Sequence, residues 1–489
     1  MNYRNLDAFI EGRSNRNIYL IADKSSEGSD KMNRTTTETY QYKNMGLIIY
    51  TLFNLVFLVF VVLSLLFNEG YFALSFFSCI FMGVVTLPIV LSRFNWTHPL
   101  MIQMVLFLMQ AISISLMATG YIDLNFYRTS SFLAGTDLEI LAIKTILVNS
   151  IGLMITYYFS FSLKIKLSRF EFSLKNSKAI YLLLAIAWGS FYLIVSKLGG
   201  ITVLIENFQQ RLVVFSGESL NYYIYLTQLG SYAAIYLYLI GNKKTSFFVF
   251  TVQILINLLM GDRGYIIFNI IIPLVIIVHL HKKKIPIRKM IIYVLCVLVF
   301  YQLYGNLRRY GSYNYGNPSI FESVLKVFKD IEHFGITATI IGLVDGKYVN
   351  YLYGKPLFNI IFAPLPRSIF PWKPMFIAES ALVGALIYNI DYVYIGLPPG
   401  LYGYGYLNFG WLGVILFSII TGLIINIFYN KNIGYYLKRR LSIPNGNLFV
   451  YVIFINLIVN PISTEVQIKM LMAFIPLLWI YFTSKKKME

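Results

Sequence analysis

Residues 46–67 read GLIIYTLFNLVFLVFVVLSLLF and carry no charged side chain. As an α-helix, a run of this length crosses the hydrocarbon core of a bilayer, which is about 30 Å thick. The whole chain has the same character: of 489 residues, 57% are hydrophobic and 13% are charged, and the mean hydropathy is +0.65. A soluble domain of this size needs more charge to cover its surface, so soluble folds are excluded.

The chain contains about twelve apolar runs that are long enough to cross or nearly cross a bilayer. The spans are predicted at residues 46–67, 71–92, 100–120, 139–161, 178–197, 222–241, 246–260, 265–280, 289–304, 407–429, 447–461 and 466–483. This pattern predicts an all-α, polytopic transmembrane bundle over residues 46–483. A polar tail precedes it (1–45), and a short basic tail follows it (484–489).

The basic residues between these spans predict the orientation. Alternate connections carry almost all of them: Arg93, Lys164, Lys166, Arg169, Lys175, Lys178, Lys243, Lys244, Lys282, Lys283, Lys284, Arg288, Lys289, Lys431, Lys438, Arg439 and Arg440. By the positive-inside rule these connections and both termini are cytoplasmic. Much of the net charge of +19 therefore faces the anionic inner leaflet, which argues against a nucleic-acid partner.

Two segments on the predicted outer side are longer than simple connections, residues 198–221 and 305–406. Loops of that length in a compact protein are usually functional. The first reads as an amphipathic helix in the membrane interface, with Arg211 at the edge of its apolar stripe. Arg211 either snorkels to lipid phosphate or is held for an anionic ligand.

The sequence GDRG, residues 261–264, separates two apolar runs of about 15 residues each, which are short for a full crossing. We therefore expect this turn to lie below the outer surface and to line a cavity. Arg263 at that depth needs an anionic partner, either Asp262 or a phosphate group of a ligand. Arg308 and Arg309 follow a span directly on the outer side, where they either anchor to headgroups or bind a ligand.

The long outer segment contains further candidates. Residues 320–336 read as an amphipathic helix in which Glu332 falls on the apolar face, a setting expected to raise its pKa and to suit proton transfer; a structural salt bridge is the alternative. In PRSIFPWKP, residues 366–374, the prolines present Arg367 and Lys373 on a stiff backbone. The Gly- and Tyr-rich stretch 396–413 follows, either as part of the site or as an interfacial aromatic belt.

These motifs together resemble the Wzy-type oligosaccharide repeat-unit polymerases of O-antigen and capsule synthesis. The resemblance rests on the glycine-led helix with Arg211, on GDRG, and on PRSIFPWKP before YLNFG (406–410), and it covers about residues 46–483. It implies a membrane glycosyltransferase of the C class in a bacterial inner membrane. Where the family pattern has an acidic residue shortly before YLNFG, this chain has Tyr404.

The resemblance implies a reaction at the outer leaflet. A glycan on undecaprenyl diphosphate is transferred to a new lipid-linked repeat unit, undecaprenyl diphosphate is released, and a chain-length regulator is an expected partner. Arg211, Arg263, Arg308 and Arg309 are predicted to bind diphosphate, and Arg367, Lys373, Tyr404 and Asn408 the substrate. Glu332 is the predicted base, and Arg263 is also predicted to be catalytic.

No cofactor or metal is expected, because neither the cysteines nor the histidines have metal-ligand spacing. A lipid-linked oligosaccharide flippase and a ligase that transfers finished glycan remain alternatives.

Overall fold

The computed structural model describes residues 46–67, 70–92, 95–121, 137–161, 174, 178–206, 220–261, 263–281, 296, 299–300, 332–355, 357, 371–372, 379–388, 399–439 and 441–459. Within these ranges the chain is helical and has no strand. The predicted spans at 289–304 and 466–483 lie almost entirely outside the described residues. The all-helical, membrane-spanning character is confirmed for the part of the chain that is described.

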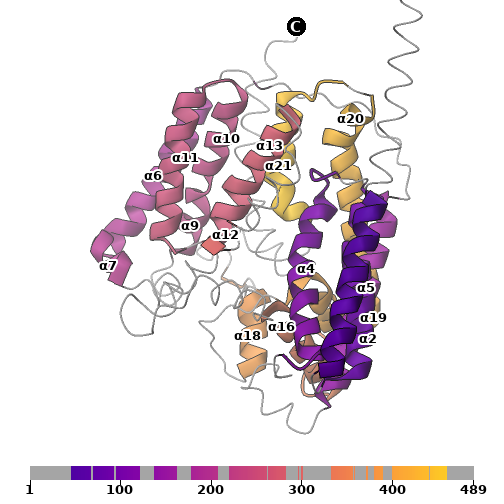
Figure 1. The fold of residues 1–489 in the computed structure, drawn as a ribbon. Helices are drawn as coiled ribbons and strands as arrows, with labels where there is room; N and C mark the ends of the chain where they lie inside the picture. Colours follow the sequence, from indigo (N-terminus) through magenta and orange to yellow (C-terminus); the bar gives the residue numbers. More distant parts are fainter. Residues whose placement is uncertain are drawn as a thin grey trace, which may run out of the picture.

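The first group of helices is formed by residues 46–161 and extends along one side of the molecule (Figure 1). Its members are the helix Gly46–Phe67, α2 (Phe72–Thr86), α3 (Pro88–Leu91), α4 (Pro99–Ala118) and α5 (Leu138–Phe161). Helix α2 packs against both α4 and α5.

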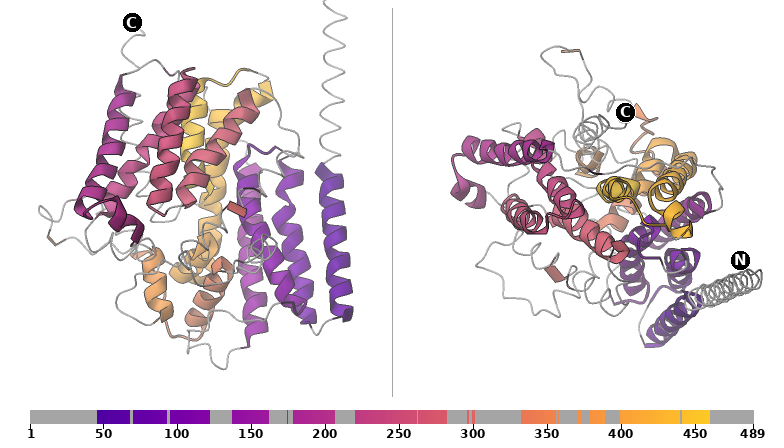
Figure 2. Two further views of the ribbon diagram at one scale, coloured as in Figure 1. Left: turned by 60° about the vertical axis from the view of Figure 1, so that its left-hand side comes forward. Right: turned by 90° about the horizontal axis from the view of Figure 1, so that it is seen from above.

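The second group lies beside the first, and the helices of both groups run roughly along one axis (Figure 2). Its members are α6 (Ala179–Lys197), α7 (Ile201–Glu206), α9 (Asn221–Thr227), α10 (Leu229–Leu239), α11 (Lys243–Leu259), α12 (Arg263–Ile266), the π-helical turn η2 (Ile267–Ile271) and α13 (Ile272–His281). Helix α10 is buried between α6 and α11.

The C-terminal helices connect the two groups. They are α16 (Glu332–Asp345), α18 (Glu379–Tyr388), α19 (Gly400–Tyr429), η3 (Asn430–Gly434), α20 (Tyr435–Arg439) and α21 (Asn445–Val459). Helix α19 packs along α5, and α21 contacts α19 and α4 on one side and α10 and α13 on the other. A large hydrophobic core therefore runs through both groups, and a smaller cluster around Ile194, Leu204 and Met260 lies within the second group.

Six helices of the described chain are long and apolar enough to cross a membrane. Their outward surfaces are apolar: Phe67 is 82% exposed and Phe72 79% exposed. Side chains of this kind in contact with water would be costly, so this surface is suited to lipid. Several buried hydroxyls within the helices donate to the carbonyl four residues earlier, as Thr145 does to Leu141 at 2.8 Å, which satisfies them without water.

Six of the described basic residues gather at one end of the molecule, which we call the basic end, whereas Lys144, Lys347 and Lys355 lie at the opposite end. The described members of the basic end are Lys178, Lys243, Lys244, Lys431, Lys438 and Arg439, at the starts of α6 and α11 and around α20 (Figure 1). His98, before α4, is packed against Phe161 and Tyr429 at this end. Burial, together with the charge of Lys438, lowers the pKa of His98 to about 3, so its imidazole stays neutral at physiological pH.

The opposite end, which we call the distal end, is formed by residues 70–71, 118–121, 137–144, 345–355 and 406–411. The backbone of Tyr71 donates to Ala118 at 2.8 Å there. The alternation of ends along the described helices agrees with the alternation that the basic residues predict from the sequence.

Candidate functional site

The motif YLNFG forms a reversal of the chain inside α19. Phe409 (φ −145°) and Gly410 (φ 59°) are not helical, so α19 consists of two arms, residues 400–408 and 411–429. Residues on either side of the reversal are neighbours. Tyr406 packs edge-on against Trp411 with ring centroids 6.0 Å apart, and the ring centroids of Tyr404 and Phe417 are also 6.0 Å apart. The short arm therefore folds back antiparallel along the start of the long arm.

Glycines make this reversal and this close packing feasible. Gly410 occupies the left-handed region, which costs glycine little, and a Cβ atom there would press on the Tyr351 hydroxyl. Gly405 and Gly413 face each other across the two arms, and a Cβ atom on Gly413 would overlap the carbonyl oxygen of Gly405. The arms thus touch backbone to backbone, as small residues allow in membrane helices.

Asn408 fastens the end of the short arm. Its side chain is fully buried, donates to the Tyr404 carbonyl at 2.8 Å and accepts from the Gly354 amide at 3.0 Å. The amides of Leu352 and Tyr353 donate to the carbonyls of Leu407 and Asn408, both at 3.1 Å. These bonds satisfy carbonyl groups that the end of a helix leaves without intrahelical partners.

The tyrosines of the short arm have different surroundings. Tyr404, which stands where the resemblance led us to expect an acid, is 2% exposed and packs against Phe417. Tyr402 reaches α5, where its hydroxyl lies 3.2 Å from Thr156 Oγ1. Tyr404 and Asn408 were predicted to bind substrate, and the structure places both inside the packing of the turn.

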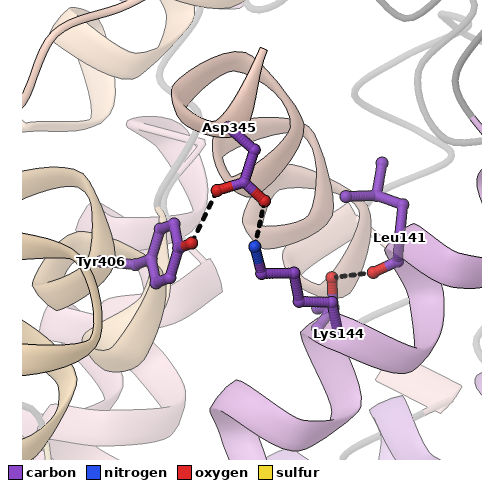
Figure 3. A network of polar contacts seen from close by, with 5 residues as sticks. Leu141, Lys144, Asp345 and Tyr406 are labelled. Carbon is purple, nitrogen blue, oxygen red and sulfur yellow. Dashed lines mark hydrogen bonds and ion pairs between the residues drawn. The ribbon is translucent and has the colours of Figure 1, made fainter. Parts of the chain in front are cut away.

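A charged network lies at the distal end beside this turn (Figure 3). The Tyr406 hydroxyl donates to Asp345 Oδ1 at 2.7 Å, and Lys144 forms an ion pair with the other carboxylate oxygen. The lysine and aspartate side chains are about one-third exposed, at 32% and 35%. Three elements, α5, α16 and α19, are joined by these contacts.

Neither Lys144 nor Asp345 was among the predicted site residues. The signal available in the sequence was a lysine within the apolar span 139–161, because a charge inside a span usually has a partner. The identity of that partner follows only from the fold, since Asp345 is distant in sequence. The network places a carboxylate against YLNFG although position 404 is a tyrosine.

The GDRG turn joins α11 to the helix that follows it. Helix α11 ends at Leu259 with Met260 as its C-cap, and Gly261 takes a left-handed φ of 70°. Arg263 begins α12, which continues through η2 and α13 to His281. Met260, Tyr265 and Ile266 are 5% exposed or less, so the turn lies in buried surroundings. Asp262 and the Arg263 side chain lie outside the described part of the structure.

Buried amide side chains lie beneath this turn. Gln228 donates to Asn257 at 2.9 Å and accepts from Asn269 at 3.2 Å, and all three are 6% exposed or less. Asn269 belongs to the π-helical turn η2, a geometry found frequently at functional sites. The network ties α10 and α11 to the helix that Arg263 begins. It was not predicted, because isolated amides in apolar runs carry no recognisable spacing.

The remaining predicted site residues are only partly described. Glu332 is the first residue of α16, and its side chain lies outside the described part. Of the predicted helix 320–336, residues 332–336 are described and belong to α16, which ends at Asp345; Phe334, Ile336 and Ile341 of this helix are fully buried. Outside the described residues lie Arg211, Arg308, Arg309, Arg367 and Lys373. Among described residues, no group of side chains has the composition of a metal site.

Comparison with known proteins gives one match. The family model described as O-antigen polysaccharide polymerase Wzy matches residues 50–488, which is most of the chain. No curated protein and no solved structure matches it.

Proposed function

The chain belongs to the O-antigen polysaccharide polymerase Wzy family, and from this premise we propose that it polymerises undecaprenyl diphosphate-linked repeat units at the outer leaflet of a bacterial inner membrane. The resemblance seen in the sequence is thereby confirmed at the level of the family. Membership implies a multi-pass membrane polymerase that acts on lipid-linked oligosaccharides. The carrier, the leaflet, the residue roles and independence of metal ions belong to the proposal.

In the proposed reaction a hydroxyl oxygen of the new repeat unit attacks the anomeric carbon of the growing glycan. The bond between that carbon and the diphosphate oxygen breaks, and undecaprenyl diphosphate leaves with the bonding electron pair. The hydroxyl proton passes to a base. Negative charge grows on the leaving group, so positive groups that are already in place lower the barrier.

The observation that carries the proposal is the position of Arg263. It begins a helix two residues after the buried Gly261, at the turn between two membrane helices. Helix starts favour anions because their first amides lack intrahelical partners. A guanidinium on the same residue adds a full charge and a fork of donors that matches phosphate. The amide network of Gln228, Asn257 and Asn269 holds this helix start from below.

The other roles follow the chemistry of each side chain. Arg211, Arg308 and Arg309 bind diphosphate together with Arg263, and Arg367 and Lys373 hold the donor glycan. Glu332 accepts the proton of the attacking hydroxyl. Tyr404 and Asn408 act on the substrate through the shape of the YLNFG turn, because both side chains are buried in it.

The test uses purified protein in detergent with a synthetic undecaprenyl diphosphate-linked repeat unit, EDTA and no nucleotide sugar. We expect the wild type to produce a ladder of longer lipid-linked glycans. Arg263→Ala should lower the rate about 100-fold, the scale expected when one oxyanion-stabilising donor is lost. Arg263→Lys should restore only part of the rate, because lysine keeps the charge and loses the fork. Glu332→Gln should also lower the rate.

Lys197→Ala is the matched control, since it removes a charge near the far end of α6 that lies over the ring of Tyr223. All variants are compared at equal amounts of monodisperse protein. A full ladder from Arg263→Ala would contradict the diphosphate role. A wild type without a ladder on a matched substrate would favour the flippase or ligase alternatives, which a lipid-scrambling assay in liposomes then separates.

A further inference from the structure

A segment of alternating tyrosines and polar residues follows α16 at the distal end. Residues 345–355 read DGKYVNYLYGK, and most of their side chains are exposed. Tyr353 is 63% exposed and Tyr351 is 37% exposed, with ring centroids 6.0 Å apart. Across the turn, Trp411 is also 37% exposed. We call Tyr351, Tyr353 and Trp411, with the ion pair Lys144–Asp345, the distal platform.

The platform is held rigidly. The backbone amides of Leu352 and Tyr353 are bonded to the short arm of α19, and Gly354 is bonded to the buried Asn408. Tyr353 has a φ of 49°, a left-handed conformation that is unfavourable for a bulky side chain. Such a residue persists only where its surroundings determine it, and it is most often found where a function requires it.

Polar groups lie next to these rings. Tyr406, which packs against Trp411, donates to Asp345, and Lys144 completes the network. One carboxylate and one ammonium, each about one-third exposed, keep further capacity for hydrogen bonds. The Lys144 nitrogen lies 5.6 Å from the centre of the Tyr406 ring.

Sugars present both kinds of surface. A pyranose ring has a face of C–H groups, which stacks on aromatic rings, and an edge of hydroxyls, which bind carboxylates and ammonium groups. Rigid tyrosine and tryptophan side chains supply contact area at a low entropic cost. We propose that the distal platform binds the oligosaccharide part of the lipid-linked glycan. This inference rests on the proposed function, because it names the site that holds the sugar chain of that substrate.

An interfacial aromatic belt is the competing explanation for exposed tyrosines. A belt needs rings at the headgroup level, but it does not need a left-handed backbone or a carboxylate joined to three helices. Tyr192 is a true belt-like side chain for comparison: it lies on α6, is 70% exposed and is surrounded by apolar residues of its own helix.

The distal platform and Glu332, the proposed base, lie at opposite ends of one helix, so a single glycan can contact both. Glu332 and Asp345 are the two ends of α16, a helix of 14 residues and therefore about 20 Å long. A glycan whose reacting end is near Glu332 can extend along this helix to the platform. Contacts there would retain the growing chain between additions and favour longer products.

The direct test measures sugar binding without chemistry. Full-length protein in nanodiscs is mixed with lipid-free oligosaccharides of one to several repeats, prepared by acid cleavage of the polymer of the source bacterium. Saturation-transfer NMR and titration calorimetry then measure binding. Tyr353→Asn removes the ring and keeps a residue that tolerates the left-handed backbone. We expect about three- to tenfold weaker binding in this variant. Tyr353→Phe should bind within about twofold of wild type.

Tyr192→Leu is the control and should leave sugar binding unchanged. Asp345→Asn tests the polar half of the platform and should also weaken binding. In the polymerase assay, Tyr353→Asn should shift the ladder toward shorter products. Binding that is absent in wild type, or unchanged in both Tyr353→Asn and Asp345→Asn, would overturn the platform.

Failure of the two proposals is distinguishable. A wild type that binds the oligosaccharides in a Tyr353-dependent way but forms no ladder would support the platform and contradict the polymerase reaction. A wild type that forms a normal ladder, together with variants whose ladder length and sugar binding equal those of wild type, would support the polymerase reaction and contradict the platform.

Discussion

At the scale of single residues, Asn408 offers the clearest link between the YLNFG motif and the structure. Asn408→Leu would remove the acceptor for the Gly354 amide and the donor to the Tyr404 carbonyl, leaving both buried. A buried group without its partner costs about 1–3 kcal/mol, so we expect the variant to lose about 2–4 kcal/mol of stability. Thermal unfolding in detergent, followed by size-exclusion chromatography, measures this loss.

The matched control is Asn350→Leu, which makes the same replacement on an exposed side chain and should change stability by less than about 0.5 kcal/mol. If Asn408→Leu unfolded at the same temperature as wild type while the KM for the lipid-linked substrate rose, direct substrate contact would replace the structural role.

Residue identity alone could indicate that YLNFG matters but not how. The asparagine and the glycine stand out because both tolerate unusual backbone conformations. The partners of Asn408 are Gly354 and Tyr404, and only the second is close in sequence. The Lys144–Asp345 pair was missed for the same reason, since its members are about 200 positions apart.

At the scale of elements, the predicted span 407–429 matches the long arm of α19, but the short arm 400–408 that folds back along it was not predicted. The apolar pattern is continuous from residue 400 to 429, so hydropathy alone cannot locate a reversal within it. The reversal depends on Gly405, Gly410 and Gly413, which permit contact between backbones. By contrast, the spans at 100–120, 139–161 and 178–197 were predicted within two residues of their observed ends, because each is bounded by polar residues.

Gly413→Ala should separate the two arms. The added Cβ atom would overlap the Gly405 carbonyl oxygen, a backbone atom that cannot move independently of its helix. Overpacking of this kind costs about 3 kcal/mol, and we expect a loss of polymerase activity together with a lower unfolding temperature. Activity and unfolding are both measured on the purified variant.

Gly189→Ala is the matched control for this element. Its Cβ atom would meet nothing within 4 Å, and alanine is the better helix former. We expect it to stabilise α6 by about 0.5–1 kcal/mol and to leave activity unchanged. A Gly413→Ala protein as stable and active as Gly189→Ala would refute close packing of the arms.

At the scale of the whole molecule, composition was sufficient to predict a helical membrane protein, and the motifs were sufficient to predict its family. The assembly of the site was not predictable, because it depends on contacts between distant segments. The structure shows this for Asp345 with Tyr406 and for Gln228 with Asn269.

The orientation in the membrane gives the last prediction. Both natural cysteines, Cys79 and Cys296, are first replaced by serine, and a single cysteine is then introduced at Asn350 or at Asn242. Both positions are exposed, the first at the distal end and the second at the basic end. Because lysines and arginines are retained on the cytoplasmic side, the basic end should face inward.

In intact spheroplasts, a membrane-impermeant maleimide should therefore label Asn350→Cys and leave Asn242→Cys unlabelled until the membrane is permeabilised. Labelling of Asn242→Cys in intact spheroplasts would place the basic end outside. The distal platform and the YLNFG turn would then face the cytoplasm, on the wrong side for a polymerase that takes its substrate from the outer leaflet. Polymer synthesis by each variant in cells confirms that the labelled protein is the active one.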